Sequence, residues 1–177
     1  TTACVLIEPE IQGSGGMKLQ PPGFVEAVSA LCAKYGVHLI LDEIFVGFGR
    51  TGKFLIEENR PGIDADFVCV GKGLTAGYLP LAATLTKEKI YEAFLGNFDE
   101  YKAFFHGHTF TGNPLACAVA LKNIEKIRRL IASGTLAETI DCLGKRTEEA
   151  FRGQADGAEY GRRLTVTRRL RDIAGHT

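Results

Sequence analysis

Two short apolar runs separated by one helical segment constrain the fold of this chain more than any other feature. Residues 3–9 (ACVLIEP) and 37–43 (VHLILDE) each have the length and composition of a buried strand. Between them, residues 24–36 carry apolar side chains at helical spacing, with Pro22 near the start and Gly36 at the end. Strand, helix and strand at this spacing form a βαβ unit, in which the two strands are parallel. The sequence therefore predicts an α/β fold.

The rest of the chain extends this unit into a parallel-rich sheet with flanking helices. Residues 66–72 (DFVCVGK) and 79–86 (LPLAATLT) have the composition of two further strands. A loop is expected over residues 104–114, which contain Gly, Asn and Pro. The apolar spacing predicts helices over residues 87 to about 95, 114–132 and about 136–151.

Charge and cysteine content narrow the function classes. Lys and Arg total 21, as do Asp and Glu, so no overall field attracts nucleic acid or an anionic membrane. No apolar run is long enough for a membrane helix. The five cysteines are dispersed without C-x-x-C spacing, which is typical of a reducing compartment. We therefore expect a cytoplasmic protein that binds neither nucleic acid nor a membrane.

The stretch GFGRTGKF (residues 47–54) comes close to two nucleotide-binding patterns. A phosphate loop needs a Ser or Thr after its lysine, but Phe54 stands there, and Pro61 stops any helix soon after. The glycines also fit G-x-G-x-x-G, but the acidic ribose ligand expected at the end of the next strand is missing. We therefore interpret Gly47, Gly49 and Gly52 as turn residues that allow tight or left-handed backbone.

Two polar residues near strand ends are more informative than the glycines. Asp42 ends one predicted strand and Lys72 ends the next, and in a parallel sheet both emerge at the same edge. Pyridoxal phosphate (PLP) needs a lysine for a Schiff base and an acid against its pyridinium nitrogen. It also needs polar groups for its phosphate, for which the loop HGHTFTG offers Thr109 and Thr111. The pattern therefore favours a PLP site.

Each of these residues also has a plainer interpretation. An Asp at a strand end is usually a turn or cap residue, and Thr109 alone is an ordinary loop hydroxyl. Lys72 follows an apolar run and precedes a glycine, which favours a functional lysine and a structural one about equally. His106 and His108 form an H-x-H pattern without an evident third ligand, so we expect no metal site.

Three segments together resemble the class III aminotransferases, which are PLP enzymes of fold type I. They are LILDEIFVGFGRTGKF, DFVCVGKGLTAGYLPLAATLT and FFHGHTFTGNPLACAVALKNIE, and the resemblance covers about residues 3 to 130. It implies part of the large PLP-binding domain over residues 1–131 and the helical start of a small domain over 132–160. The basic segment 161–177 does not resemble the family, and we expect a solvated tail or the product of a shifted reading frame.

The resemblance also implies residue roles. Lys72 carries the cofactor and moves the proton, Asp42 pairs with the pyridine nitrogen, and Ile44 packs on a ring face. Thr109 binds the cofactor phosphate of the neighbouring subunit in a homodimer with shared active sites, and His108 lines the same entrance. Two further roles follow: Glu8 belongs to a motif near the cofactor, and Arg50 is structural.

Within the family, the last two segments resemble most the branch that makes 7,8-diaminopelargonic acid for biotin synthesis. This implies amino transfer from S-adenosylmethionine to 8-amino-7-oxononanoate. The alternatives are another ω-amino-acid or 4-aminobutyrate-type transaminase, or a catalytically silent piece. The last alternative follows from a departure, because the phosphate cradle and substrate-binding arginine of the family have no counterpart here. A smaller departure is Phe45 and Val46, where the family usually has a small or polar residue and then Thr.

Overall fold

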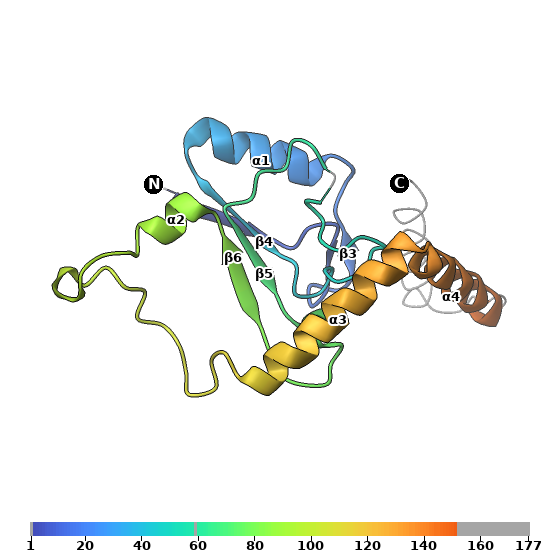
Figure 1. Ribbon diagram of the computed structural model, residues 1–177. Helices are drawn as coiled ribbons and strands as arrows, with labels where there is room; N and C mark the ends of the chain where they lie inside the picture. Colours follow the sequence, from blue (N-terminus) through green and yellow to red (C-terminus); the bar gives the residue numbers. More distant parts are fainter. Residues whose placement is uncertain (1, 59, 152–177) are drawn as a thin grey trace.

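A four-stranded sheet forms the centre of the computed structural model, which describes residues 2–58 and 60–151. The strand order is β1-β4-β5-β6, in which β1, β4 and β5 are parallel and β6 is antiparallel to β5. Figure 1 shows these strands side by side. Their bounds are Cys4–Ile7 for β1, His38–Asp42 for β4, Phe67–Val70 for β5 and Ala83–Thr86 for β6. The predicted α/β fold with a parallel-rich sheet is confirmed.

Two of the helices begin or end at the Pro and Gly residues that predicted their limits. Helix α1 (Phe24–Tyr35) connects β1 to β4 and ends at Gly36, which adopts the left-handed conformation at φ 62°. Helix α3 (Pro114–Ala132) begins where Pro114 predicted, with the Asn113 side chain accepting hydrogen bonds from two backbone amides of its first turn. None of the helices in the described ranges is both long and apolar enough to cross a membrane.

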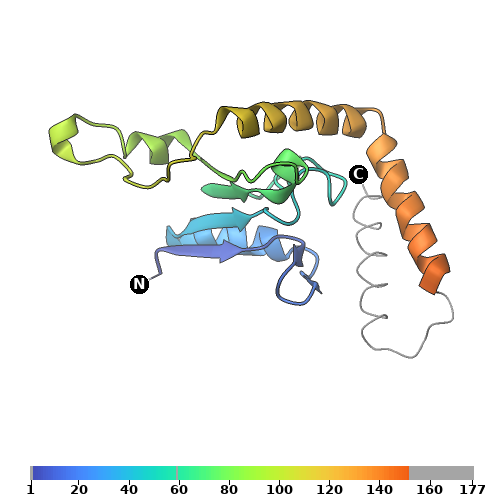
Figure 2. The same cartoon turned by 90° about the horizontal axis from the view of Figure 1, so that it is seen from below.

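The other helical segments agree less closely with expectation. Helix α2 (Glu88–Glu92) is shorter than predicted, whereas α4 (Thr135–Phe151) matches the predicted stretch within one residue at its start. Two 3-10 turns, η1 (Lys72–Thr75) and η2 (Phe98–Glu100), were not predicted. Helices α3 and α4 follow one another at an angle beside the sheet (Figure 2). The segment 161–177 and the last nine residues of segment 132–160 lie outside the described residues.

A small hairpin in the glycine-rich loop was also missed. Strands β2 (Ile11–Gln12) and β3 (Lys18–Leu19) pair antiparallel there. Each has only two residues, which is too short for a hydrophobic period to appear in the sequence. The hairpin fixes the path of the chain directly after β1.

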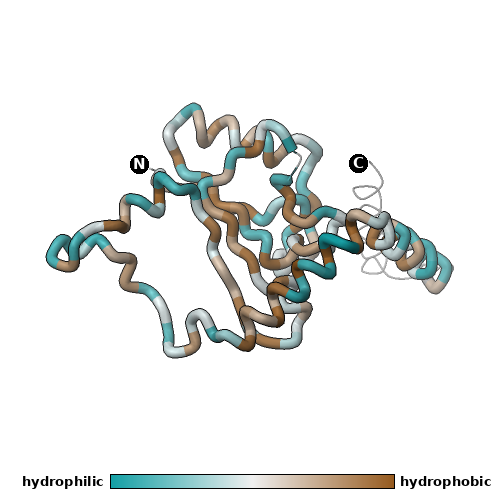
Figure 3. The backbone as a smooth tube through the Cα atoms, viewed as in Figure 1, coloured by the Kyte–Doolittle hydropathy of each residue, from teal (hydrophilic) through white to brown (hydrophobic). Residues whose placement is uncertain are grey.

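One face of the sheet carries the core and the other is more open. The inward side chains of β4 and β5 pack with α1 and α3, and both strands are largely apolar along their length (Figure 3). Ile40, Asp42 and Cys69 point to the opposite face and are only partly buried. The core members contributed by these four elements are Leu39, Leu41, Val68, Val70, Val25, Cys32 and Ala120.

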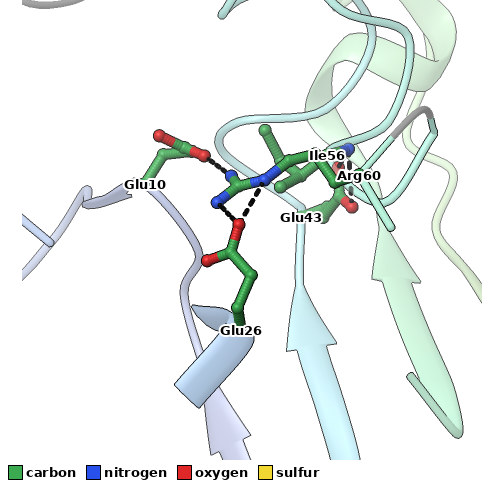
Figure 4. Close-up of polar contacts among 5 residues, drawn as sticks. All are labelled: Glu10, Glu26, Glu43, Ile56 and Arg60. Carbon is green, nitrogen blue, oxygen red and sulfur yellow. Dashed lines mark hydrogen bonds and ion pairs between the residues drawn. The ribbon is translucent and has the colours of Figure 1, made fainter. Parts of the chain in front are cut away.

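A buried carboxyl group joins the end of β4 to the segment that follows it. Glu43 is fully buried, and both its carboxyl oxygens lie 3.0 Å from the Ile56 amide, which donates to them (Figure 4). Nearby, Arg60 bridges Glu10 and Glu26 and so ties the same segment to the first hairpin and to α1. Burial, reinforced by the neighbouring carboxylates of Glu57, Glu58 and Glu10, raises the pKa of Glu43 from 4.5 to about 7.

The buried carboxyl predicts a stability that depends on pH. The folded protein binds the Glu43 proton more tightly than the unfolded chain, so the stabilisation is complete below pH 4.5 and is lost as the pH rises through about 7. We expect the free energy of unfolding to fall by up to about 3 kcal/mol across this window. Urea unfolding at several pH values measures the slope, and E43Q should reduce it. An unchanged slope in E43Q would contradict this assignment.

Candidate active site

The ends of β4 and β5 bring the two chemically suggestive residues to one edge. Asp42, the last residue of β4, lies opposite Cys69 in the parallel register. Lys72 follows Cys69 by three residues and begins η1. The carboxyl edge of a parallel sheet is where α/β proteins build ligand sites. The predicted juxtaposition of Asp42 and Lys72 at this edge therefore agrees with the strand register.

Asp42 and Ile44 lie together at this edge of the sheet, at the end of β4 and in the turn that follows it. The Asp42 carboxylate Oδ1 accepts a hydrogen bond from the Ile44 amide at 3.0 Å, which fixes the backbone turn after the strand. The Ile44 side chain lies beside Gly71, because a β-carbon on that glycine would be 3.5 Å from Ile44 Cγ2. An apolar side chain thus stands next to the residue that precedes the lysine, and its backbone amide donates to Asp42.

Lys72 occupies an unusual backbone conformation. Its φ is 33°, in the left-handed region that side chains with a β-carbon rarely adopt. The residue is exposed, and its Nζ atom lies 5.6 Å from the centre of the Phe45 ring. A lysine held at a position better suited to glycine is the kind of strain that accompanies functional residues.

The turn that carries Lys72 is fixed from two sides. The Asn123 side chain of α3 donates hydrogen bonds to the carbonyl oxygens of Gly73 and Leu74, at 2.6 and 3.1 Å. A β-carbon on Gly73 would lie 3.0 Å from Phe48 Cβ and 3.3 Å from the Gly47 carbonyl oxygen. The lysine turn is therefore wedged between α3 and the glycine-rich segment 47–54.

Segment 47–54 is a closed turn with no helix behind it. The amide of Phe48 donates to the carbonyl of Phe54 at 2.7 Å, and Gly49 and Gly52 have positive φ. Gly47 has no room for a β-carbon, which would meet the Glu43 carbonyl oxygen at 2.9 Å. The interpretation of these glycines as turn residues is confirmed.

Helices α3 and α4 hold this turn from outside. A β-carbon on Gly49 would meet Leu136 at 3.0 Å and Ile127 at 3.5 Å, so both helices approach its backbone closely. The guanidinium of Arg128 lies 4.0 Å from the centre of the Phe54 ring. Arg50, predicted to be structural, is exposed and stacks its guanidinium 4.8 Å from the centre of the Phe45 ring.

Glu8 shapes the neighbouring loop. Its carboxylate Oε2 accepts a hydrogen bond from the Gly13 amide at 2.8 Å, and its carbonyl accepts one from the Gln20 side chain at 3.2 Å. Gly13 in turn lies against the Phe45 ring, to which a β-carbon on that glycine would approach within 2.9 Å. Glu8 thus acts on the site through the loop it organises.

Thr109 and His108 lie in an exposed loop between η2 and α3. The His108 side chain accepts a hydrogen bond from the Phe110 amide, and its own amide donates to the Thr111 hydroxyl at 3.0 Å. The segment between α2 and α3 reaches away from the sheet in both views (Figure 1, Figure 2). The hydrogen bonds described for this loop remain within it, so its predicted role at a cofactor stays a prediction.

The fold agrees with the comparisons with known proteins. The family model described as aminotransferase class III matches residues 1–161. The chain belongs to the class III aminotransferase family. A relative from Geobacter sulfurreducens, named adenosylmethionine-8-amino-7-oxononanoate aminotransferase, is 50% identical over 141 residues, covering 80% of this chain and 31% of the relative. A relative of the same name from Anoxybacillus flavithermus is 52% identical over 128 residues, or 72% of this chain and 28% of the relative.

Solved structures of aminotransferases share the fold. The adenosylmethionine-8-amino-7-oxononanoate aminotransferase of Methanocaldococcus jannaschii matches with a TM-score of 0.74 and 43% identity, over 87% of this chain and 35% of that structure. The ornithine aminotransferase of Toxoplasma gondii matches with a TM-score of 0.68 and 30% identity, over 86% and 34%. The chain spans about a third of the length of the curated relatives it matches.

Sequence reasoning missed three residues that shape the site. Asn123 had no visible signal within a long amphipathic helix, because its partners are backbone carbonyls about fifty positions earlier. Glu43 was not singled out, because the functional interpretation was given to its neighbour Asp42. An acid inside an apolar run was nevertheless a usable signal. Phe45 was noted only as a departure from the family, without its contacts to Gly13, Arg50 and Lys72.

Two neighbouring glycines provide a matched test of the wedged turn. G73A forces a β-carbon against the Phe48 side chain and the Gly47 carbonyl oxygen, so we expect a loss of about 1–3 kcal/mol in the free energy of unfolding. G71A should be tolerated, because its backbone is extended at φ −171° and its β-carbon would make ordinary contacts at 3.5 Å. Denaturant unfolding of both variants measures the difference. Equal effects of the two substitutions would contradict the wedge.

Proposed function

We propose that this chain is the lysine-bearing part of a PLP-dependent aminotransferase. The observation that carries the proposal is the placement of Asp42 and Lys72 at adjoining ends of parallel strands. The proposed reaction is amino transfer from S-adenosylmethionine to 8-amino-7-oxononanoate. The names of the relatives at 50 and 52% identity support this choice of substrates.

The residues at the strand edge fit the reactive end of PLP. When bound, PLP supplies an electron sink that stabilises negative charge at the carbon next to the transferred amine. The Lys72 amine is exposed and can form a Schiff base with a carbonyl, and it can then carry a proton to and from that carbon. The Asp42 carboxylate is suited to hold the proton on a ring nitrogen, and Ile44 offers an apolar side chain beside it.

The phosphate end requires residues from outside this edge. We assign Thr109 to the phosphate of a neighbouring subunit, with His108 at the same entrance, in a homodimer with shared active sites. Large exposed apolar side chains around this loop support a partner surface there, since monomeric surfaces rarely gather so many. They include Phe98 at 89% exposure, Phe105 at 77%, Phe110 at 72% and Phe104 at 68%.

The domain boundaries form part of the same proposal. Residues 1–131 would belong to the PLP-binding large domain, and 132–160 would begin the small domain. The break at Ser133 and Gly134 between α3 and α4 supports a boundary near residue 132, because Gly134 has a left-handed φ of 76°.

Two alternatives follow from specific observations. Structural likeness to an ornithine aminotransferase favours a wider class of ω-amino-acid or 4-aminobutyrate-type transaminases. The coverage of about a third of the relatives favours a catalytically silent chain that needs further segments. Both exposed edge strands, β1 and β6, support the second alternative, because unpaired strand edges favour association.

The first experiment traps the cofactor on the chain. The purified 177-residue protein is incubated with PLP, reduced with borohydride and digested, and pyridoxyl-lysine is located by mass spectrometry. We expect selective labelling of Lys72, with K72A as the control that loses it. Scattered labelling of surface lysines, or none, would contradict a cofactor site in this chain.

A substrate panel separates the transaminase alternatives. If the proposal on substrates is correct, the enzyme accepts 8-amino-7-oxononanoate with S-adenosylmethionine as amino donor, measured by formation of 7,8-diaminopelargonic acid. Amino transfer only with 4-aminobutyrate or ornithine would instead support the wider class. D42N should abolish most activity with any substrate, because it removes the carboxylate from the ring nitrogen.

A further inference from the structure

We propose that Phe45 is a positioning residue for Lys72. Its ring face holds the Lys72 ammonium at the strand edge whenever the lysine is not covalently engaged. The inference deepens the proposed function and rests on it, because it assigns a resting place to the lysine that this function makes reactive. Phe45 stands where the resemblance led us to expect a small or polar residue.

Two cationic side chains lie close to the Phe45 ring. Lys72 Nζ lies 5.6 Å from the ring centre, within the range of about 6 Å over which a cation is attracted to an aromatic face. The Arg50 guanidinium lies 4.8 Å from the same centre. One ring therefore contacts two cations, one from each of the segments that meet at the strand edge.

The Phe45 ring is fixed by its surroundings. Phe45 is half-buried and packs on the small cluster of Ile11, Val46 and Ile56. Its other contact is the backbone of Gly13, where a β-carbon would lie 2.9–3.2 Å from three ring carbons. A ring held in this way offers a rigid surface to the flexible lysine side chain.

The Lys72 side chain has conformational freedom that the ring can restrict. Lys72 has a left-handed backbone, and it is exposed. An exposed lysine side chain loses considerable rotamer freedom when it is held in one place. A fixed aromatic face next to Asp42 and Ile44 restricts that freedom before any reaction. Arg50 of the turn 47–54 contacts the same Phe45 ring, so a shift of this turn would also move the surface on which the lysine rests.

The test measures the reactivity of the Lys72 amine without any cofactor. The full chain and two variants are treated briefly with acetic anhydride near neutral pH, and acetylation of each lysine is quantified by mass spectrometry. The reagent acetylates an amine that it can reach, and a ring that holds the Lys72 amine against its face restricts this access. F45L removes the ring and keeps an apolar side chain, whereas F45Y keeps the ring. Lys34 and Lys122, which do not contact Phe45, serve as internal controls for an intact fold.

We expect F45L to raise the acetylation rate of Lys72 by about two- to fivefold, because the ring no longer restrains the amine, and F45Y to leave it unchanged. Rates at Lys34 and Lys122 should not change in either variant. Equal Lys72 rates in F45L and the unmodified chain would overturn the proposal, as would equal changes in F45L and F45Y. Because PLP is absent, a failure here is distinguishable from a failure of the cofactor-trapping experiment.

Discussion

The parallel pairing of β4 with β5 is the constraint on which the rest of this structure depends. It sets Asp42 opposite Cys69 and so fixes the separation between the acid and the turn that begins at Lys72. A slip of one residue would turn Asp42 toward the core and the inward side chains outward, which the buried Leu41 and Val70 forbid. The hydrophobic core therefore specifies the geometry of the candidate active site.

The turn 47–54 connects the strand edge to the helices. Glu43 anchors its return path through the Ile56 amide, and Phe48 and Gly47 press against Gly73 beneath the lysine. Helices α3 and α4 close on Gly49 from the other side. A segment that resembles a nucleotide-binding loop in sequence thus supports the lysine turn by packing against it. Gly47 packs against the Glu43 carbonyl, Gly49 packs against the side chains of Leu136 and Ile127, and both Gly49 and Gly52 adopt positive φ.

Local sequence patterns were sufficient for the strands, for α1 and α3, and for the placement of Asp42 and Lys72 at neighbouring strand ends. Their signals, apolar runs and Pro or Gly punctuation, lie within a few residues of the element they specify. The hairpin β2–β3 was missed because each of its strands has only two residues. The contacts of Glu43 and Asn123 were missed because their partners are backbone groups distant in sequence. The family resemblance supplied roles for Thr109 and His108 that neither local pattern nor the described contacts provide.

The most direct test of the central claim is the protonation state of the cofactor ring on this chain. PLP labelled with ¹⁵N at the pyridine nitrogen is bound to the protein and to D42N, and the nitrogen chemical shift is recorded by NMR. The account predicts a protonated ring nitrogen in the unmodified chain and an unprotonated one in D42N, because the proposed function assigns the carboxylate at that nitrogen to Asp42. The same shift in both proteins, or no bound cofactor in either, would contradict it.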